Sequence, residues 1–143
     1  MPREPSSFWT GLSAETLPVG SVYSFLQDGR AGGVCVFVGT SRRWTGSVET
    51  EALTYEAYPP MAEAELDRLA RASADRWDAF RVVVLHRTGR VAPPDASVVV
   101  GVSCAHRAEA FEACRWLIDT LKHEVPIWKT EHAPHLPIPK PSA

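Results

Sequence analysis

The chain has 143 residues, of which 45% are hydrophobic and 22% are charged, so it has enough apolar material for a packed core and differs from a disordered segment. Its 15 Lys and Arg residues and 17 Asp and Glu residues give a formal net charge of -2, which argues against a wide basic surface for nucleic acid. We therefore expect one domain over residues 1–143 with no nucleic-acid partner.

The cysteines and the apolar stretches indicate the compartment. Cys35, Cys104 and Cys114 are odd in number and form no CxxC pair, so they specify neither a disulfide framework nor a structural zinc site. The first ten residues have no basic flank leading into an apolar stretch, and no later stretch approaches the roughly 18 apolar residues that cross a bilayer. We expect a cytoplasmic protein that binds no membrane.

In the first part of the chain, the apolar residues of segment 15–28 have helical spacing, and Gly29 suits a helix end. GVCVFVG at 33–39 is rich in β-branched residues and bounded by glycines, which predicts a strand buried on both faces. Segment 48–58 alternates between apolar and polar residues, which predicts a second strand. We expect it to run antiparallel to the first because the connection is short.

The second part continues the alternation of helices and strands. Apolar residues recur at helical spacing over 60–77, after a proline that tolerates a first helical turn. Segments 81–86 and 97–104 are rich in valine and predict strands. Segment 107–122 carries the apolar stripe of a further helix, formed by Ala110, Phe111, Cys114, Leu117, Ile118 and Leu121, and 125–129 predicts a short last strand.

This order of elements predicts an α/β (α+β) fold. A two-layer sandwich of helices on a mainly antiparallel sheet is the simplest way to bury the apolar stripes. Residues 1–14 are expected to form an N-terminal extension, and the proline-rich residues 132–143 an extended tail.

Basic side chains occur at the ends of predicted elements in three distant parts of the chain. An anionic ligand would explain all three, because a phosphate needs several charge-assisted donors and a helix N-terminus adds free amide groups. The alternative, that each side chain is simply solvated on a loop, stays open. The basic residues are Arg42 and Arg43, His106 and Arg107, and Lys122 and Lys129.

Lysine is rare in this chain, since only Lys122, Lys129 and Lys140 stand among the 15 basic residues, and an amine can do chemistry that a guanidinium cannot. Lys122 follows Phe111 by nearly three helical turns, which predicts a position at the edge of the buried helix face. Partial burial would lower its pKa and make it a better base. A cation that only stabilises the helix C-terminus is the alternative.

A thiol could instead carry the chemistry. Cys104 and His106 are two residues apart at a strand end, close enough for a thiolate and a base if both side chains point the same way. The five histidines have no compact metal-ligand spacing, so we expect no metal site.

Five stretches together resemble the MoaE family, the catalytic large subunits of molybdopterin synthase. Their order and spacing cover nearly the whole chain. They are GGVCVFVGTSR (32–42), LTYEAYPPMAEAEL (53–66), LHRTGRV (85–91), SCAHRAEAFEAC (103–114) and LKHEVPIWKTE (121–131).

The resemblance implies an α/β fold of hammerhead type and a homodimer that assembles with a small ubiquitin-like subunit into a heterotetramer. That subunit would donate sulfur from a thiocarboxylate on its C-terminal Gly-Gly tail. Two sulfurs would be transferred to cyclic pyranopterin monophosphate, which forms the dithiolene of molybdopterin, with no metal or cofactor bound to this chain.

The resemblance also implies roles for individual residues. The family's catalytic lysines match Lys122 and Lys129, and Glu131 would orient Lys129. The substrate pocket would contain Thr40, Ser41, Arg42, His106 and Arg107, and in a dimer the arginine of one protomer could lie beside the lysines of the other. Ser41 stands where the family more often has valine, and the bulky Arg43 and Trp44 follow.

A non-catalytic module that binds a ubiquitin-like tail or a phosphate ligand is the alternative function. The two lysines argue against it, because arginine, which this chain otherwise prefers, would serve for anion binding alone.

Overall fold

The structure is a computed structural model that describes residues 4–134, so positions 1–3 of the expected extension and 135–143 of the expected tail lie outside the described residues. The elements follow one another as the 3-10 helix η1 (Pro5–Ser7), β1 (Phe8–Ser13), α1 (Val19–Leu26), β2 (Gly33–Thr40), β3 (Trp44–Thr45), β4 (Val48–Glu49), β5 (Ala52–Ala57), α2 (Pro59–Trp77), β6 (Arg81–Arg87), β7 (Gly89–Val91), β8 (Ala96–Cys104), α3 (Arg107–Glu124) and β9 (Ile127–His132).

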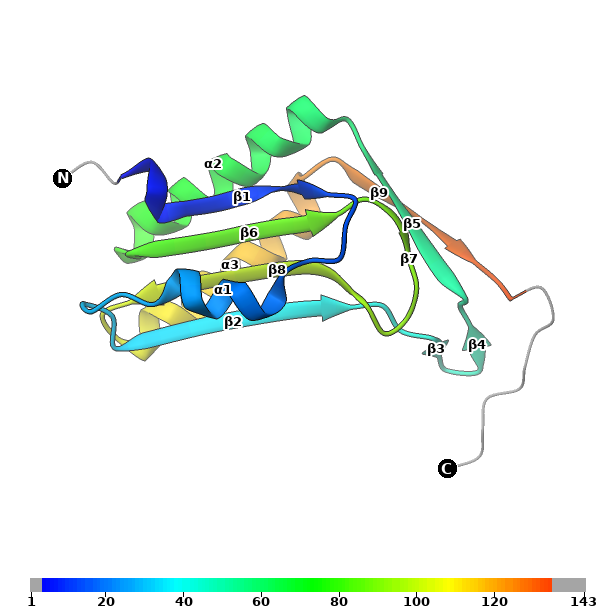
Figure 1. Ribbon diagram of the computed structural model, residues 1–143, viewed down its shortest axis with the longest axis horizontal. Helices are drawn as coiled ribbons and strands as arrows, with labels where there is room; N and C mark the ends of the chain where they lie inside the picture. Colours follow the sequence, from blue (N-terminus) through cyan, green and yellow to red (C-terminus); the bar gives the residue numbers. More distant parts are fainter. Residues whose placement is uncertain (1–3, 135–143) are drawn as a thin grey trace.

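The main sheet has four strands in the order β1-β6-β8-β2. β1 pairs with β6 in parallel, and the other two pairs are antiparallel. Helices α2 and α3 cover one face of this sheet, and α1 lies on the other face (Figure 1). The predicted fold class, helices on a mainly antiparallel sheet, is confirmed. The structure adds that the helices are divided between the two faces.

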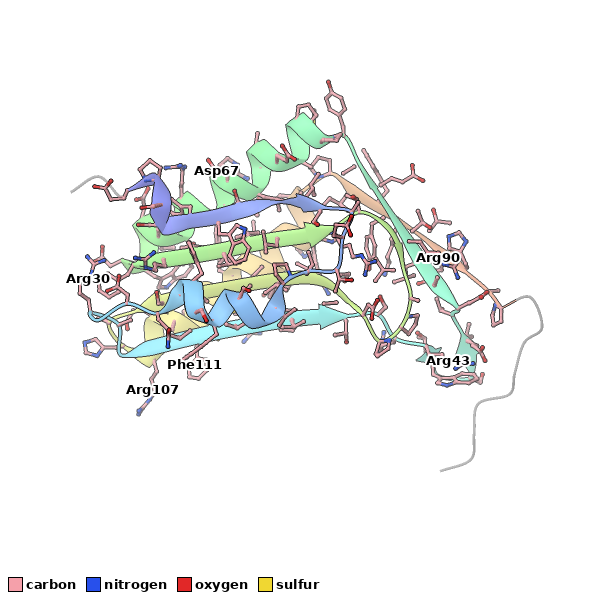
Figure 2. The ribbon with its side chains drawn as sticks, in the orientation of Figure 1. Arg30, Arg43, Asp67, Arg90, Arg107 and Phe111 are labelled. Carbon is pink, nitrogen blue, oxygen red and sulfur yellow. The ribbon has the colours of Figure 1, made fainter. Side chains whose placement is uncertain are left out.

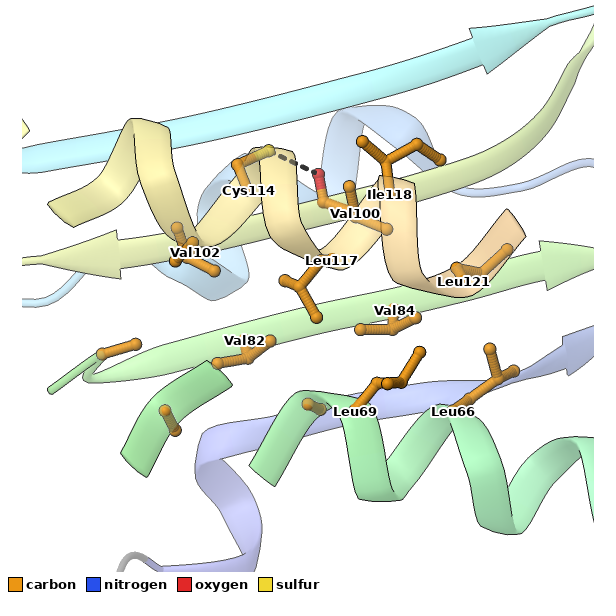
Figure 3. Packing of buried hydrophobic residues seen from close by; sticks show 14 of the residues in the cluster. Leu66, Leu69, Val82, Val84, Val100, Val102, Cys114, Leu117, Ile118 and Leu121 are labelled. Carbon is orange, nitrogen blue, oxygen red and sulfur yellow. Dashed lines mark hydrogen bonds between the residues drawn. The ribbon is translucent and has the colours of Figure 1, made fainter. Parts of the chain in front are cut away.

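The core is built from the two central strands, whose alternate residues pack against different helices. Val82 and Val84 of β6 and Val100 and Val102 of β8 face α2 and α3, while residues such as Val83 and Val99 face α1. Both faces are covered, so these strands are apolar throughout rather than alternating. Figure 3 shows side chains of α2 and α3, among them Leu66, Leu69 and Leu117, meeting the sheet in this core.

A second sheet, in the order β7-β5-β9, crosses one end of the main sheet, and β3 and β4 form a small hairpin beside it (Figure 1). The prediction that 48–58 is one strand beside 33–39 is therefore wrong. The segment forms β4 and β5, and β5 pairs with β7 and β9. The reason is the 41–51 connection, which turns back on itself through the hairpin and carries the chain away from the main sheet.

The prediction that 33–39 is buried on both faces is also wrong. β2 is an edge strand that pairs only with β8 among the described strands, so Val34, Val36 and Phe37 remain exposed. The expected extension 1–14 contains β1, which adds a parallel strand at the opposite edge. Among the described residues, no helix is long and apolar enough to span a membrane.

Candidate active site

A cleft of about 650 Å³ lies where the second sheet meets the end of the main sheet. Its walls come from the end of β2 and the loop after it, the end of β6, the start of β8, the last turn of α3, β5 and β9. Six of the eight residues expected in a substrate site line it, namely Thr40, Ser41, Arg42, Lys122, Lys129 and Glu131. Two of these six residues, Thr40 and Glu131, are therefore 91 positions apart in sequence and share one cavity.

The two lysines reach the cleft from different elements. Lys122 belongs to the last turn of α3, which ends at Glu124, and the N–H of the following Val125 donates to the Leu121 carbonyl at 3.1 Å. The chain then enters β9, whose alternate residues Lys129 and Glu131 face the cleft. Because neighbouring strand residues point to opposite sides, Trp128 lies on the other face of the sheet. The helix end and the strand alternation thus bring two amines to one site.

The cleft-facing lysines are exposed in this chain. The expectation that Lys122 is partly buried at the edge of the apolar helix face is not met. That expectation assumed that Phe111 is buried. Phe111 is in fact 62% exposed, because the buried stripe of α3 runs through Ala110, Ala113 and Leu117 instead. The chemistry of Lys122 in a ligand-free single chain therefore depends on its position in the cleft rather than on burial.

The segment after β2 forms the polar wall of the cleft. The β2–β8 register shifts between Gly39 and Thr40, and the Ser41 N–H donates to the Asp95 carbonyl at 3.0 Å, which fixes the turn. Ser41 is 4% exposed, and its Oγ has no hydrogen-bond partner among the described residues. A buried hydroxyl without a partner is costly unless a ligand or water bonds it. The Arg42 side chain follows on the exposed rim.

His106 and Arg107 do not line this cleft. They begin α3, and Lys122 lies 15 residues further along the helix, or about 22 Å at 1.5 Å per residue. Figure 2 shows Arg107 at the end of the molecule opposite Arg43 and Arg90. His106 lines a separate hollow with Arg30 and Trp77. Within one chain, the structure brings six of the eight expected residues together and leaves these two apart.

Two aromatic residues of the cleft, Tyr55 and His86, were missed by the sequence reasoning. Their rings meet edge to face, with centroids 4.9 Å apart. Burial lowers the pKa of His86, whose Nδ1 lies 2.7 Å from the Arg87 carbonyl oxygen. The available signal was that both residues fall inside family-like stretches and inside predicted strands. Nothing in the sequence placed those strands around one cavity.

Cys104 and Cys114 are not suited to nucleophilic catalysis. Cys104 is buried at the end of β8, and burial raises the pKa of its thiol to about 11, so the thiol is protonated at neutral pH. Cys114 packs in the core, where its Sγ donates to the Val100 carbonyl at 3.8 Å (Figure 3). The structure thus favours a core role for both residues over the thiol chemistry considered above.

Within residues 4–134, no three His, Cys, Asp or Glu side chains are grouped so that they could hold a metal ion. The ionisable groups that line the cleft are amines, a guanidinium, an imidazole, a phenol and a carboxylate. This set can bind an anion and move protons.

Comparisons with known proteins identify the family of this chain. The sequence profile of the family described as "MoaE protein" matches residues 12–124. The molybdopterin synthase catalytic subunit 1 of Mycobacterium tuberculosis is 42% identical over 120 residues, which cover 84% of this chain and 82% of that protein. The human molybdopterin synthase catalytic subunit is 39% identical over 129 residues, which cover 90% of this chain and 69% of the human protein.

A third relative, from Halalkalibacterium halodurans, is 45% identical, and the match spans 65% of its length. Among solved structures, molybdopterin synthase from Staphylococcus aureus superposes with a TM-score of 0.82 at 32% identity, covering 92% of this chain and 96% of that one. The chain therefore belongs to the MoaE family, as its motifs indicated.

Proposed function

We propose that this chain is the catalytic subunit of a cytoplasmic molybdopterin synthase. It transfers two sulfurs to cyclic pyranopterin monophosphate, one from the C-terminal thiocarboxylate of each of two small ubiquitin-like subunit molecules, which leave as carboxylates, and the two sulfurs form the dithiolene of molybdopterin. The observation that carries this proposal is the convergence of Lys122, Lys129 and Arg42 on one cleft from three different elements. Three free cysteines suit a reducing compartment.

The chemistry of the cleft suits this reaction. Arg42 and the hydroxyls of Thr40 and Ser41 provide donors for the substrate phosphate. One lysine ammonium stabilises the negative charge that develops on the attacked thiocarboxylate or on the departing carboxylate, and the other amine moves protons at the pterin carbons. Glu131 shares the cleft-facing side of β9 with Lys129, at the spacing of alternate strand residues, and orients that amine.

The sulfur donor is a separate chain in this proposal. A Gly-Gly tail has no bulky side chains, so it can lie along a narrow cleft and bring its terminal thiocarboxylate to the lysines. A structure from Helicobacter pylori described as a complex of subunits 1 and 2 of molybdopterin-converting factor has a similar fold, with a TM-score of 0.71 at 21% identity. That complex is one of two different subunits, which is the assembly we propose here.

A homodimer would supply the two expected residues that one chain leaves apart. The outer edge of β2 has no strand partner among the described residues, and exposed Val34, Val36 and Phe37 lie along this strand. An unpaired apolar edge is a surface on which a second copy can add a strand. Two β2 strands that pair edge to edge about a twofold axis run antiparallel, so the start of each strand lies beside the end of the other.

That pairing would complete the site. Gly33, at the start of β2, packs closely on the helix start, since a Cβ added there would lie 2.9 Å from the Cα of Arg107. Thr40, at the end of β2, lines the cleft. A twofold pairing therefore carries Arg107 and His106 of one protomer towards the cleft of its partner. The substrate site is then shared between two chains, with lysines from one and the α3 N-terminus from the other.

Reconstitution tests the function. The purified protein is incubated with a thiocarboxylated small subunit and cyclic pyranopterin monophosphate, and dithiolene formation is measured for the unchanged protein and for Lys122→Ala and Lys129→Ala. We expect each substitution to reduce the rate by at least about a hundredfold, the scale of a lost acid–base or charge-stabilising group. Arg115→Ala, which removes a highly exposed cation of α3 outside the cleft, is the matched control.

The same assay separates the enzyme from a non-catalytic binding module. A binding module would hold the donor tail or the phosphate ligand in a direct titration and form no dithiolene. Full activity of both lysine variants would show that the amines do not carry the reaction.

A further inference from the structure

His86 is a buried titratable side chain of the cleft with no role in the chemistry described so far. It is the next-to-last residue of β6 and is 5% exposed. Its ring packs edge to face on Tyr55, which lies opposite Lys129 across β5 and β9. A polar ring held at this place can contact whatever occupies the cleft.

The hydrogen bond of the ring determines which nitrogen carries the proton. Nδ1 lies 2.7 Å from the backbone carbonyl oxygen of Arg87. A carbonyl oxygen only accepts, so Nδ1 is the donor and carries the hydrogen. Burial lowers the pKa of the ring, although the same hydrogen bond opposes the shift, so the ring is neutral at pH 7. Nε2 then has a lone pair and no hydrogen.

This lone pair is available to a ligand. No hydrogen-bond partner of Nε2 is present among residues 4–134. The other charged and titratable groups of the cleft come from four of the surrounding segments, and most of them are hydrogen-bond donors. They are Arg42 after β2, Tyr55 on β5, Lys122 on α3, and Lys129 and Glu131 on β9. Within this set, His86 is a neutral acceptor on the main-sheet wall.

We infer that His86 is a substrate-binding residue whose Nε2 accepts a hydrogen bond from an N–H group of the bound heterocycle. This assignment rests on the proposed function and adds the orientation in which the substrate is bound. A lone pair repels phosphate oxygens, which also carry lone pairs, so the phosphate lies towards Arg42. The ring N–H or amino group lies towards His86, and the substrate is bound in one direction along the cleft.

Two variants separate the acceptor from the shape of the ring. His86→Phe keeps a flat ring against Tyr55 and removes both nitrogens, while His86→Gln keeps an oxygen acceptor near the place of Nε2. We expect His86→Phe to raise the KM for the pterin substrate about tenfold with kcat nearly unchanged, as for one lost hydrogen bond to a donor left unpaired. We expect His86→Gln to stay within about threefold of the unchanged protein. His132→Phe, which removes a histidine that does not line the cleft and that has a hydrogen bond of its own to Thr54, is the matched control.

A spectroscopic measurement on the unchanged protein needs no variant. Nitrogen-15 NMR of histidine-labelled protein reports which ring nitrogen carries hydrogen. We expect the His86 signals of a neutral ring with hydrogen on Nδ1, and a change in the Nε2 signal when cyclic pyranopterin monophosphate is added. If His86→Phe fails to fold, this titration alone decides the assignment.

The outcomes distinguish this inference from the proposed function. Suppose that the unchanged protein forms dithiolene, but the NMR shows that Nε2 of His86 carries hydrogen, or the Nε2 signal does not change when the substrate is added. His86 is then not the acceptor, and the proposed function stands. A fall in kcat with an unchanged KM in His86→Phe would also overturn the assignment, because the ring would then act by positioning Lys129 rather than by binding the substrate. If the unchanged protein neither binds the pterin nor forms dithiolene, both proposals fail together.

Discussion

Tyr55 and Lys129 lie directly opposite each other on the antiparallel strands β5 and β9, and both side chains face the cleft. Opposite residues of such a pair have Cβ atoms about 5 Å apart, so the tyrosine ring forms a wall beside the lysine stem. The same ring packs on His86. The aromatic side chain thus connects a proposed catalytic amine of the second sheet to a polar ring of the main sheet.

The first prediction concerns this wall. Tyr55→Ala removes the ring that limits the positions of Lys129 and His86, so we expect kcat/KM for dithiolene formation to fall about tenfold. Tyr55→Phe keeps the ring and should remain within about threefold. Tyr58→Ala, at an exposed tyrosine just after β5, controls for the loss of an aromatic residue elsewhere. A Tyr55→Ala protein with the full rate would show that the pair has no functional role.

The second prediction tests the shared site with mixed dimers. Arg107→Ala and Lys122→Ala proteins should each be nearly inactive. When equal amounts are unfolded and refolded together, half of the dimers are mixed, and each mixed dimer has one site with both residues intact, so activity should recover to about a quarter of the unmutated level. The two variants refolded separately and then combined serve as the control. No recovery after refolding together would mean that Arg107 does not act across the dimer.

The third prediction concerns Cys104. Its buried thiol, with the pKa raised to about 11, is uncharged at neutral pH, so Cys104→Ala should keep the sulfur-transfer rate within about twofold. The measurement is dithiolene formation, with thermal unfolding of the same sample as the control for folding. Loss of turnover in a folded Cys104→Ala protein would contradict this and point to sulfur carried on this chain.

The fourth prediction is a pH dependence of stability at Asp28, whose side chain is 8% exposed. Its carboxylate accepts hydrogen bonds from the backbone N–H and the guanidinium of Arg30, with Arg81 nearby at 3.5 Å. The hydrogen bonds to Arg30 hold the pKa of Asp28 well below its ordinary value of 3.8. A lowered pKa stabilises the folded state above the unfolded pKa, and this contribution is lost as the pH falls.

Asp28→Asn should therefore lower the free energy of unfolding at pH 7, and the difference from the unchanged protein should shrink as the pH falls below 3.8. Urea unfolding at several pH values measures it. Asp67→Asn, in an exposed i,i+4 pair with Arg71, should change stability much less at every pH. A pH-independent difference for Asp28→Asn would exclude the ionised carboxylate as its cause.

Much of the fold could be predicted because it depends on local patterns. The helices α2 and α3 and the strands β6 and β8 lie within two residues of their predicted ranges, and α1 lies inside the predicted 15–28 but begins four residues later, since a 3.6-residue period or a valine run reports which face is apolar. The last strand is shifted, from the predicted 125–129 to Ile127–His132. Element ends are set by capping and pairing, which a pattern of apolar residues does not contain.

The wrong predictions concern which elements of the fold lie next to one another. The residues 33–39 are apolar enough for a central strand, yet β2 lies at an edge because the next segment, 48–58, joins another sheet. Phe111 fits the helical period, yet its side chain lies on the uncovered side of α3, between the buried Ala110 and Ala113, and is exposed. A sequence pattern reports the apolar side of an element, whereas burial depends on whether another element covers that side.

The sequence by itself determined the kinds of element, the scarcity of lysine and the motifs of the MoaE family, because these are properties of short segments. Only the tertiary structure decided that Lys122, Lys129 and Arg42 share a cleft, that His86 and Tyr55 line it, and that Arg107 lies at the far end of α3. The physical reason is that a cavity forms between elements. The residues that line it are determined by strand pairing and helix length. These act over tens of residues and leave no local signal in the sequence.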